Sequence, residues 1–160
     1  MATSIDPSQY SVSFNRTFNA PRSLVWQAWT DPKHVAQWWG PHGFTNPVCD
    51  LDVRTGGAMR IHMQGPKGTP FDGLYPMTGI YREVSPPERI VFISSALDEN
   101  GQPLFEVLTT VTFTEQGNKT KMTLKADVIS TTEKGAGHLA GMEQGWSQSL
   151  DRLDAFLAKA

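Results

Sequence analysis

The sequence predicts an α+β domain in which a curved antiparallel sheet of about seven strands surrounds one long C-terminal helix. Three observations lead to this fold class. Apolar and polar residues alternate through most of residues 44 to 128, with short turns between the runs, which favours antiparallel strands. Apolar residues recur every three or four positions from Leu139 to Leu157, which is a helical period. Two short helical stretches follow the first strand.

Residues 10 to 39 are expected to form this first strand and the two short helices. Alternating residues end at Phe18, and Ala20-Pro21 closes the strand. Pro21 suits the first position of a helix, where its missing N–H would have no partner. Asp31-Pro32 ends this helix and begins the next. Residues 1 to 9 are polar and are expected to be disordered, so the predicted domain covers residues 10 to 158.

Six further strands are expected between the short helices and the last helix. In one of them Met59, Ile61 and Met63 alternate with polar residues, which predicts one buried and one solvated face. A sheet with an apolar face has to be covered, and the last helix is the element long enough to cover it. The expected strands are residues 47–53, 59–64, 74–84, 89–96, 104–114 and 120–128.

The last helix is expected to run from about residue 132 to residue 158. Ser130 and Glu133 have the spacing of a capping box, which predicts a helix N-terminus. Gly137, Gly141 and Gly145 then recur every four residues, although each glycine costs a helix about 0.8–1.0 kcal/mol relative to alanine. The repeat indicates a close approach of another backbone, an irregular start of the helix, or a loose segment from residue 135 to residue 145 that gates a cavity.

Composition argues against several classes of protein. The chain has 160 residues, of which 39% are hydrophobic and 19% charged, as in one globular domain. A net charge of −2 provides no overall basic field, so nucleic acid is not an expected partner. No apolar run approaches the roughly 20 residues that span a bilayer, and no signal-peptide pattern is present. A cytoplasmic monomer or homodimer is therefore expected.

No metal ion or other cofactor is expected from the motifs. The four histidines lack the spacings of known zinc motifs, and Cys49 is the single cysteine. The neighbouring Asp50 would raise the pKa of the Cys49 thiol, so we interpret Cys49 as a small hydrophobic residue. The glycine-rich turns at residues 54–58 and 65–68 precede strands, whereas phosphate-binding loops precede helices.

Several short motifs, spread over roughly residues 12 to 158, resemble those of the START-like (SRPBCC) superfamily. Within it, the chain is similar to the proteins related to the C-terminal domain of the activator of heat-shock-protein-90 ATPase. The resemblance implies a helix-grip fold with a cavity between the sheet and the final helix, and it implies no single activity. The motifs are Ala20-Pro21, Val25-Trp26, Ala28-Trp29-Thr30-Asp31-Pro32, Trp38-Trp39, Asp52-Val53-Arg54, Gly56-Gly57, Gly65-Pro66, Gly68, Gly79, Tyr81, Glu83-Val84, Pro86-Pro87-Glu88-Arg89, Gly141-Met142 and Gly145-Trp146.

Binding of a small apolar molecule in this cavity is the favoured functional hypothesis. Methionine and aromatic side chains are abundant in the elements that would enclose it, and such side chains suit an adaptable pocket. A core filled by its own side chains is the alternative. Tyr75, Tyr81 and His62 are the candidates for polar contacts. The candidate ligand-binding residues are Trp38, Trp39, Phe44, Met59, Ile61, Met63, Tyr75, Met77, Tyr81, Met142 and Trp146.

Two other functions stay open at this point. An enzyme of the cyclase or hydrolase type could use Glu83 or Glu106 as a general base if that carboxylate were desolvated in the cavity. Carboxylates paired with arginines on the wet face of the sheet are the more frequent arrangement. The resemblance also implies a third possibility, a module that regulates a chaperone by binding to it.

Overall fold

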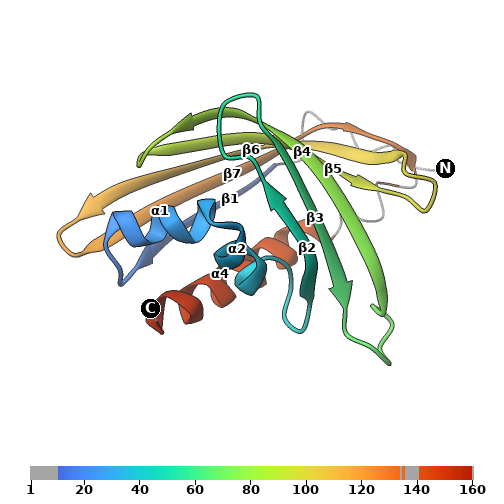
Figure 1. Cartoon of the computed structure of the whole chain (residues 1–160), viewed down its shortest axis with the longest axis horizontal. Coiled ribbons are helices and arrows are strands. Elements are labelled where there is room, and N and C mark those ends of the chain that lie inside the picture. The colour runs from blue at the N-terminus through green and yellow to red at the C-terminus, as the bar shows by residue number, and fades with distance from the viewer. Residues whose placement is uncertain (1–10, 134, 136–140, 160) are drawn as a thin grey trace.

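The computed structural model describes residues 11–133, 135 and 141–159, and over these residues it has the predicted α+β architecture (Figure 1). In chain order the elements are β1 Ser11–Phe18, α1 Arg22–Thr30, α2 Pro32–Trp38, β2 Thr45–Leu51, β3 Ala58–Gly65, β4 Gly73–Ser85, β5 Arg89–Leu97, β6 Pro103–Gln116, β7 Lys119–Thr131 and α4 Met142–Ala158.

Seven strands of the described chain form one antiparallel sheet in the order β1-β7-β6-β5-β4-β3-β2. Strands β2 to β7 are neighbours in chain order because short turns connect them, and β1 joins the far edge by pairing with β7. Register shifts interrupt the β4–β5, β5–β6 and β6–β7 pairs, and such bulges bend a sheet. Figure 1 shows the curved sheet with α4 lying beneath its concave face. The predicted helix-grip fold is confirmed.

Helix α4 buries one face because its leucines follow the helical period. Leu150, Leu153 and Leu157 are each at most 4% exposed and belong to the main core. Their partners include the inward-facing Val111 of β6 and Leu124 of β7. None of the described helices combines the length and the apolar character that crossing a membrane requires.

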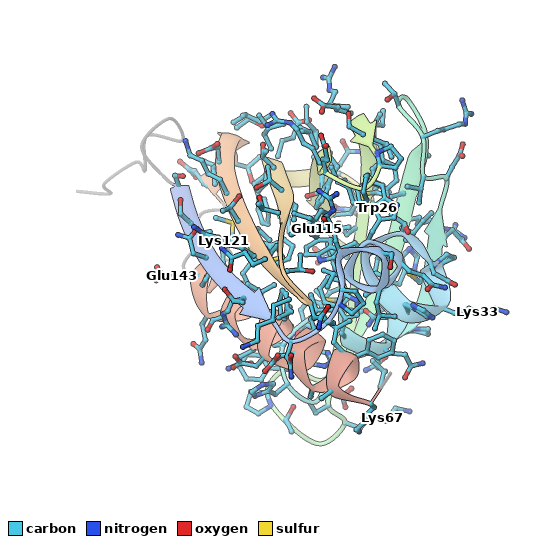
Figure 2. The ribbon with its side chains drawn as sticks, turned by 90° about the vertical axis from the view of Figure 1, so that its left-hand side faces the viewer. Trp26, Lys33, Lys67, Glu115, Lys121 and Glu143 are labelled. Carbon is cyan, nitrogen blue, oxygen red and sulfur yellow. The ribbon has the colours of Figure 1, made fainter. Side chains whose placement is uncertain are left out.

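Helices α1 and α2 close one side of the space between the sheet and α4 (Figure 2). Pro32 starts α2, and the Asp31 carboxylate accepts a hydrogen bond from the Lys33 backbone N–H, as an N-cap residue does. The indole N–H of Trp38 donates to the Ala28 carbonyl of α1 at 2.9 Å, which ties the two helices together. Trp26, labelled in Figure 2, packs edge-on against Phe113 of β6, with ring centroids 5.7 Å apart.

The junction between β7 and the last helix differs from the prediction. Strand β7 continues to Thr131 because Ser130 and Thr131 pair with β6, three residues beyond the predicted end at Val128. The capping-box assignment to Ser130 is wrong, since the Thr132 hydroxyl accepts the hydrogen bond from the Gly135 N–H.

The described part of α4 begins at Met142. Residues 1–10 and 136–140 lie outside the described residues, and with them lie the predicted disorder of residues 1 to 9 and the part of the predicted helix and gate that covers residues 136–140.

Strand β3 shows the predicted alternation of faces. Met59 and Ile61 are buried, whereas Ala58 and Arg60 are exposed. Met63 continues the inward row and is half-buried. The side-chain period of a strand therefore places both methionines of β3 on the concave face of the sheet, toward α4.

A charge placed on the inward row of β3 should abolish folding. The variant Ile61→Glu would bury a carboxylate without a partner, because the Ile61 side chain of the parent protein is 0% exposed. We expect no cooperative urea transition for this variant by far-ultraviolet circular dichroism. Ala58→Glu introduces the same charge on the exposed row and should unfold within about 0.5 kcal/mol of the parent protein. Equal behaviour of the two variants would contradict the assignment of the faces.

Candidate functional site

A cavity of about 280 Å³ lies between the concave face of the sheet and the first half of α4. Strands β3 to β6 form one wall, and α4 together with the segment after α2 forms the other. The volume is close to the lower end of the range of about 300–1,000 Å³ found for small-molecule pockets. The lining residues are Trp39, Gly40, Pro41, Met63, Tyr75, Pro76, Met77, Ser94, Ala96, Phe105, Val107, Thr109, Gly141, Met142, Gly145, Trp146 and Ser149.

Six of the eleven residues proposed from the sequence line this cavity. They come from four separate parts of the chain: the end of α2, the strands β3 and β4, and the first turns of α4. Met63, Met77 and Met142 provide flexible apolar side chains, which adapt to ligands of different shape. The full set of six is Trp39, Met63, Tyr75, Met77, Met142 and Trp146.

The other five proposed residues do not line the cavity. Trp38, Met59, Ile61 and Tyr81 are at most 4% exposed and belong to the filled part of the core. Trp38 comes from α2, and the other three come from the concave face of β3 and β4. Phe44 packs against Tyr75 of the cavity wall, with ring centroids 5.6 Å apart, and does not line the cavity itself.

Several lining residues were missed because their side chains are small. Ser94 and Ala96 occupy inward positions of β5, where alternation calls for large apolar side chains. On β4, Gly79 faces Ser94 and adds no side chain to the concave face. Small residues at consecutive inward positions of a strand were the sequence signal that could have located the empty space.

Trp39, which follows α2, and Trp146 of α4 meet at the helical wall. The Trp146 ring of α4 lies edge-on to the Trp39 ring, with centroids 5.3 Å apart, and is stacked on Trp29 of α1 at 6.2 Å. Aromatic pairs of this geometry hold one another in place. Gly40 follows Trp39 with φ of 96°, and a β-carbon there would lie 2.9 Å from the Met63 sulfur. Glycine is required at this position by both the conformation and the close approach.

Arg152 of α4 attaches the segment after α2 to the last helix. Its guanidinium group donates to the carbonyl oxygens of Trp39 at 2.9 Å, Gly40 at 2.9 Å and Pro41 at 3.0 Å. A fourth bond, of 3.1 Å, reaches the Gln37 carbonyl. Burial lowers the pKa of Arg152, although an arginine stays charged at physiological pH. Three residues of the cavity wall are thus held by a single side chain.

The described lining contains no Asp, Glu, Lys, Arg or His side chain. The Glu83 carboxylate pairs with Arg89 at 3.3 Å, outside the cavity. Glu106 accepts a hydrogen bond from Ser130 and borders a depression on the outer face of the sheet. His62 lies opposite Pro76 of the adjacent strand β4 and is not among the lining residues. Neither of the two proposed general bases therefore reaches the cavity.

Two ionisable groups in or against the filled core, Cys49 and Tyr81, are held neutral. Burial and, to a smaller extent, the charge of Asp50 together raise the pKa of the Cys49 thiol to about 11. Burial also raises the pKa of Tyr81, with smaller contributions from Cys49 and Asp52. A thiolate nucleophile is accordingly scarce at neutral pH. Among the described residues, no three His, Cys, Asp or Glu side chains lie close enough together to hold a metal ion.

Comparison with known proteins agrees with this architecture. The sequence model of the family described as Activator of Hsp90 ATPase homolog 1-like protein matches residues 19–158. This chain belongs to that family. The START-like resemblance predicted from the motifs is thereby confirmed. The comparison with curated proteins found no match.

Solved structures of bacterial proteins share the fold over nearly the whole chain. A protein from Arthrobacter aurescens is 26% identical with a TM-score of 0.80, and the match covers 99% of this chain and 92% of that one. A protein from Mycobacterium smegmatis is 28% identical with a TM-score of 0.77, covering 95% and 93%. The AHSA1 protein from Silicibacter pomeroyi has 24% identity and a TM-score of 0.76, covering 93% and 98%. The last likeness shows the fold alone.

Loss of the Arg152 guanidinium group should destabilise the folded protein. Arg152→Met retains most of the apolar stem but leaves four carbonyl oxygens without their charged donor. Hydrogen bonds to a charged group are worth about 1.5–3 kcal/mol, so we expect a loss of at least about 2 kcal/mol in urea unfolding. Lys33→Met is the control, because Lys33 is exposed and points away from the molecule in Figure 2. If both variants have the same small effect on the free energy of unfolding, Arg152 does not hold the segment after α2 in the way that the structure indicates.

The raised pKa of Cys49 predicts slow alkylation of the folded protein. At pH 8 a thiol with a pKa of about 11 has about a hundredfold less thiolate than one with the ordinary value of 9.0. Iodoacetamide should therefore modify the native protein far more slowly than the protein in urea, as followed by intact mass. Similar rates in the two states would show that Cys49 is not buried and that the pKa of its thiol is not raised.

Proposed function

We propose that this protein binds a small, largely apolar molecule reversibly in the cavity between the sheet and α4. The observation that carries the proposal is the cavity itself, about 280 Å³ with methionine and tryptophan walls and no charged side chain among its described lining. Membership in the family supplies the fold and leaves the ligand open.

The physical chemistry of the walls supports an apolar occupant. Side chains that face a void lack the dispersion contacts that a filled core provides. An apolar molecule restores these contacts and removes apolar surface from water, which is favourable by about 25 cal/mol for each Å² buried. Trp39 and Trp146 offer broad aromatic faces, and the methionines adjust to the shape of the molecule.

The absence of a cavity carboxylate from the described lining favours binding over catalysis. A general base has to come within hydrogen-bonding distance of the proton that it removes. Glu83 and Glu106, the two candidates, point to partners outside the cavity. The proposal therefore assigns no reaction to this site.

Fluorescence of the neutral apolar dye 1-aminoanthracene tests the proposal. The dye should become brighter on addition of the protein, in a saturable way, because its emission rises in apolar surroundings. Ala96→Phe should abolish most of this signal, since Ala96 lines the cavity and a phenyl ring would occupy the space. Ser95→Phe is the matched control, because Ser95 directly precedes Ala96 in β5 and borders the depression on the outer face of the sheet.

The proposal is contradicted if the parent protein gives no saturable signal, if both variants lose the signal, or if the Ser95→Phe control alone loses it. Thermal unfolding of each variant checks that the protein is folded. A folded Ala96→Phe protein that binds the dye as tightly as the parent would place the dye elsewhere on the molecule.

A further inference from the structure

Four residues that carry hydroxyl groups line the cavity, and they differ in whether the protein already uses the hydroxyl. The Tyr75 hydroxyl donates to the Phe71 carbonyl at 3.0 Å. The Ser149 hydroxyl accepts from the Gly40 N–H at 3.0 Å and donates to the Gly145 carbonyl at 2.9 Å. The hydroxyls of Ser94 and Thr109 form no hydrogen bond with any other residue that the structure describes. Two hydroxyls are thus free to bind a ligand.

The two free hydroxyls belong to adjacent strands and to the same face of the sheet. Ser94 of β5 lies opposite Val107, and Thr109 of β6 lies opposite Phe92, so the two residues are diagonal neighbours. The α-carbons of such neighbours are about 7–8 Å apart, with the side chains somewhat closer. Both residues sit in the interior of their strands, where paired backbone holds them in place.

Thr109 is the more informative of the two because it is only 1% exposed. Its hydroxyl oxygen is not among the fully buried side-chain atoms that lack a partner, so this hydroxyl is reached from the cavity. Valine has the same shape as threonine and would fill the position without presenting a polar group to the cavity. A threonine here, on the wall of a cavity, indicates that the missing partner is an atom of the ligand.

The number and kind of these groups point to one functional group. Each hydroxyl can donate one hydrogen bond, and a carbonyl oxygen has two lone pairs that can accept two. A carboxylate would also accept them, but the described lining offers no cation to balance its charge, and an unpaired charge in an apolar site is strongly disfavoured.

We propose that the cavity selects uncharged carbonyl compounds, whose oxygen accepts hydrogen bonds from Thr109 and Ser94. The apolar remainder of the molecule then lies against Trp39, Trp146 and Met142 on the opposite wall. This inference rests on the proposed function, since it names the ligand class of the same cavity.

Three naphthalenes of nearly equal size test the selectivity. 2-Acetonaphthone carries the carbonyl group, 2-isopropenylnaphthalene replaces its oxygen with a CH₂ group, and 2-naphthoate carries an anionic carboxylate. Quenching of tryptophan fluorescence at pH 7 gives the dissociation constant of each. We expect the ketone to bind about tenfold more tightly than the alkene, because the alkene leaves both hydroxyls unpaired. The carboxylate should bind more weakly than either.

Two variants test whether the hydroxyls cause this preference. Thr109→Val should weaken ketone binding about tenfold and leave alkene binding unchanged, and Ser94→Ala should act in the same direction. Thr109→Val should fold at least as well as the parent protein, because it removes a hydroxyl that has no partner in the protein. Thr110→Val is the matched control, since Thr110 pairs with Lys125 and Val91 in the outward-facing row. It should leave all three affinities unchanged.

The outcomes separate the inference from the proposed function. If neither the three compounds nor 1-aminoanthracene binds the parent protein, both are overturned, and if the dye binds but none of the three compounds does, the inference alone is overturned. If the compounds bind but the ketone has no advantage over the alkene, the inference alone is overturned. The same holds if the carboxylate binds most tightly, or if folded Thr109→Val keeps the full preference for the ketone. A preference that disappears in Thr109→Val and persists in Thr110→Val supports the inference.

Discussion

The cavity depends on the hydrogen bonds between the Arg152 guanidinium group and the backbone after α2. The last carbonyl groups of a helix have no partner inside the helix, and a cation near them is favourable. Arg152 satisfies the Gln37 carbonyl and those of the three residues that follow α2 from a helix more than one hundred residues away. The same side chain thus caps α2, fixes part of the cavity wall and sets the distance between α4 and that wall.

The sheet contributes a second constraint through the size of its inward side chains. Toward the end of α4, large residues such as Val111 and Leu124 meet Leu150 and Leu153, and the core is filled. Toward the start of α4, Ser94 occupies the corresponding inward row and leaves space. One helix lying across one concave face therefore has a filled half, which stabilises the fold, and an open half, which forms the candidate site.

The distribution of polar groups separates the interior from the surface in the described part of the chain. Arginine and carboxylate side chains pair with one another outside the cavity, as Glu83 does with Arg89. Inside, the lining hydroxyls are divided between those bonded to the protein, such as Ser149, and those left free, such as Thr109. A site of this kind suits a neutral molecule with a small polar group. Its described lining has no Asp, Glu, Lys, Arg or His side chain. Membership in the family fixes the fold and leaves the choice of ligand to the lining residues.

The sequence by itself determined the elements and the face on which each residue lies, because periodicity is a local property of the chain. It could not place a residue along that face. Ile61 and Met63 are two positions apart on one row, yet Ile61 is in the core and Met63 lines the cavity. The tertiary structure also decided that Ser130 belongs to β7, because its partner on β6 is distant in sequence. It likewise left the Thr109 hydroxyl unpaired, since pairing depends on which neighbours folding brings within reach.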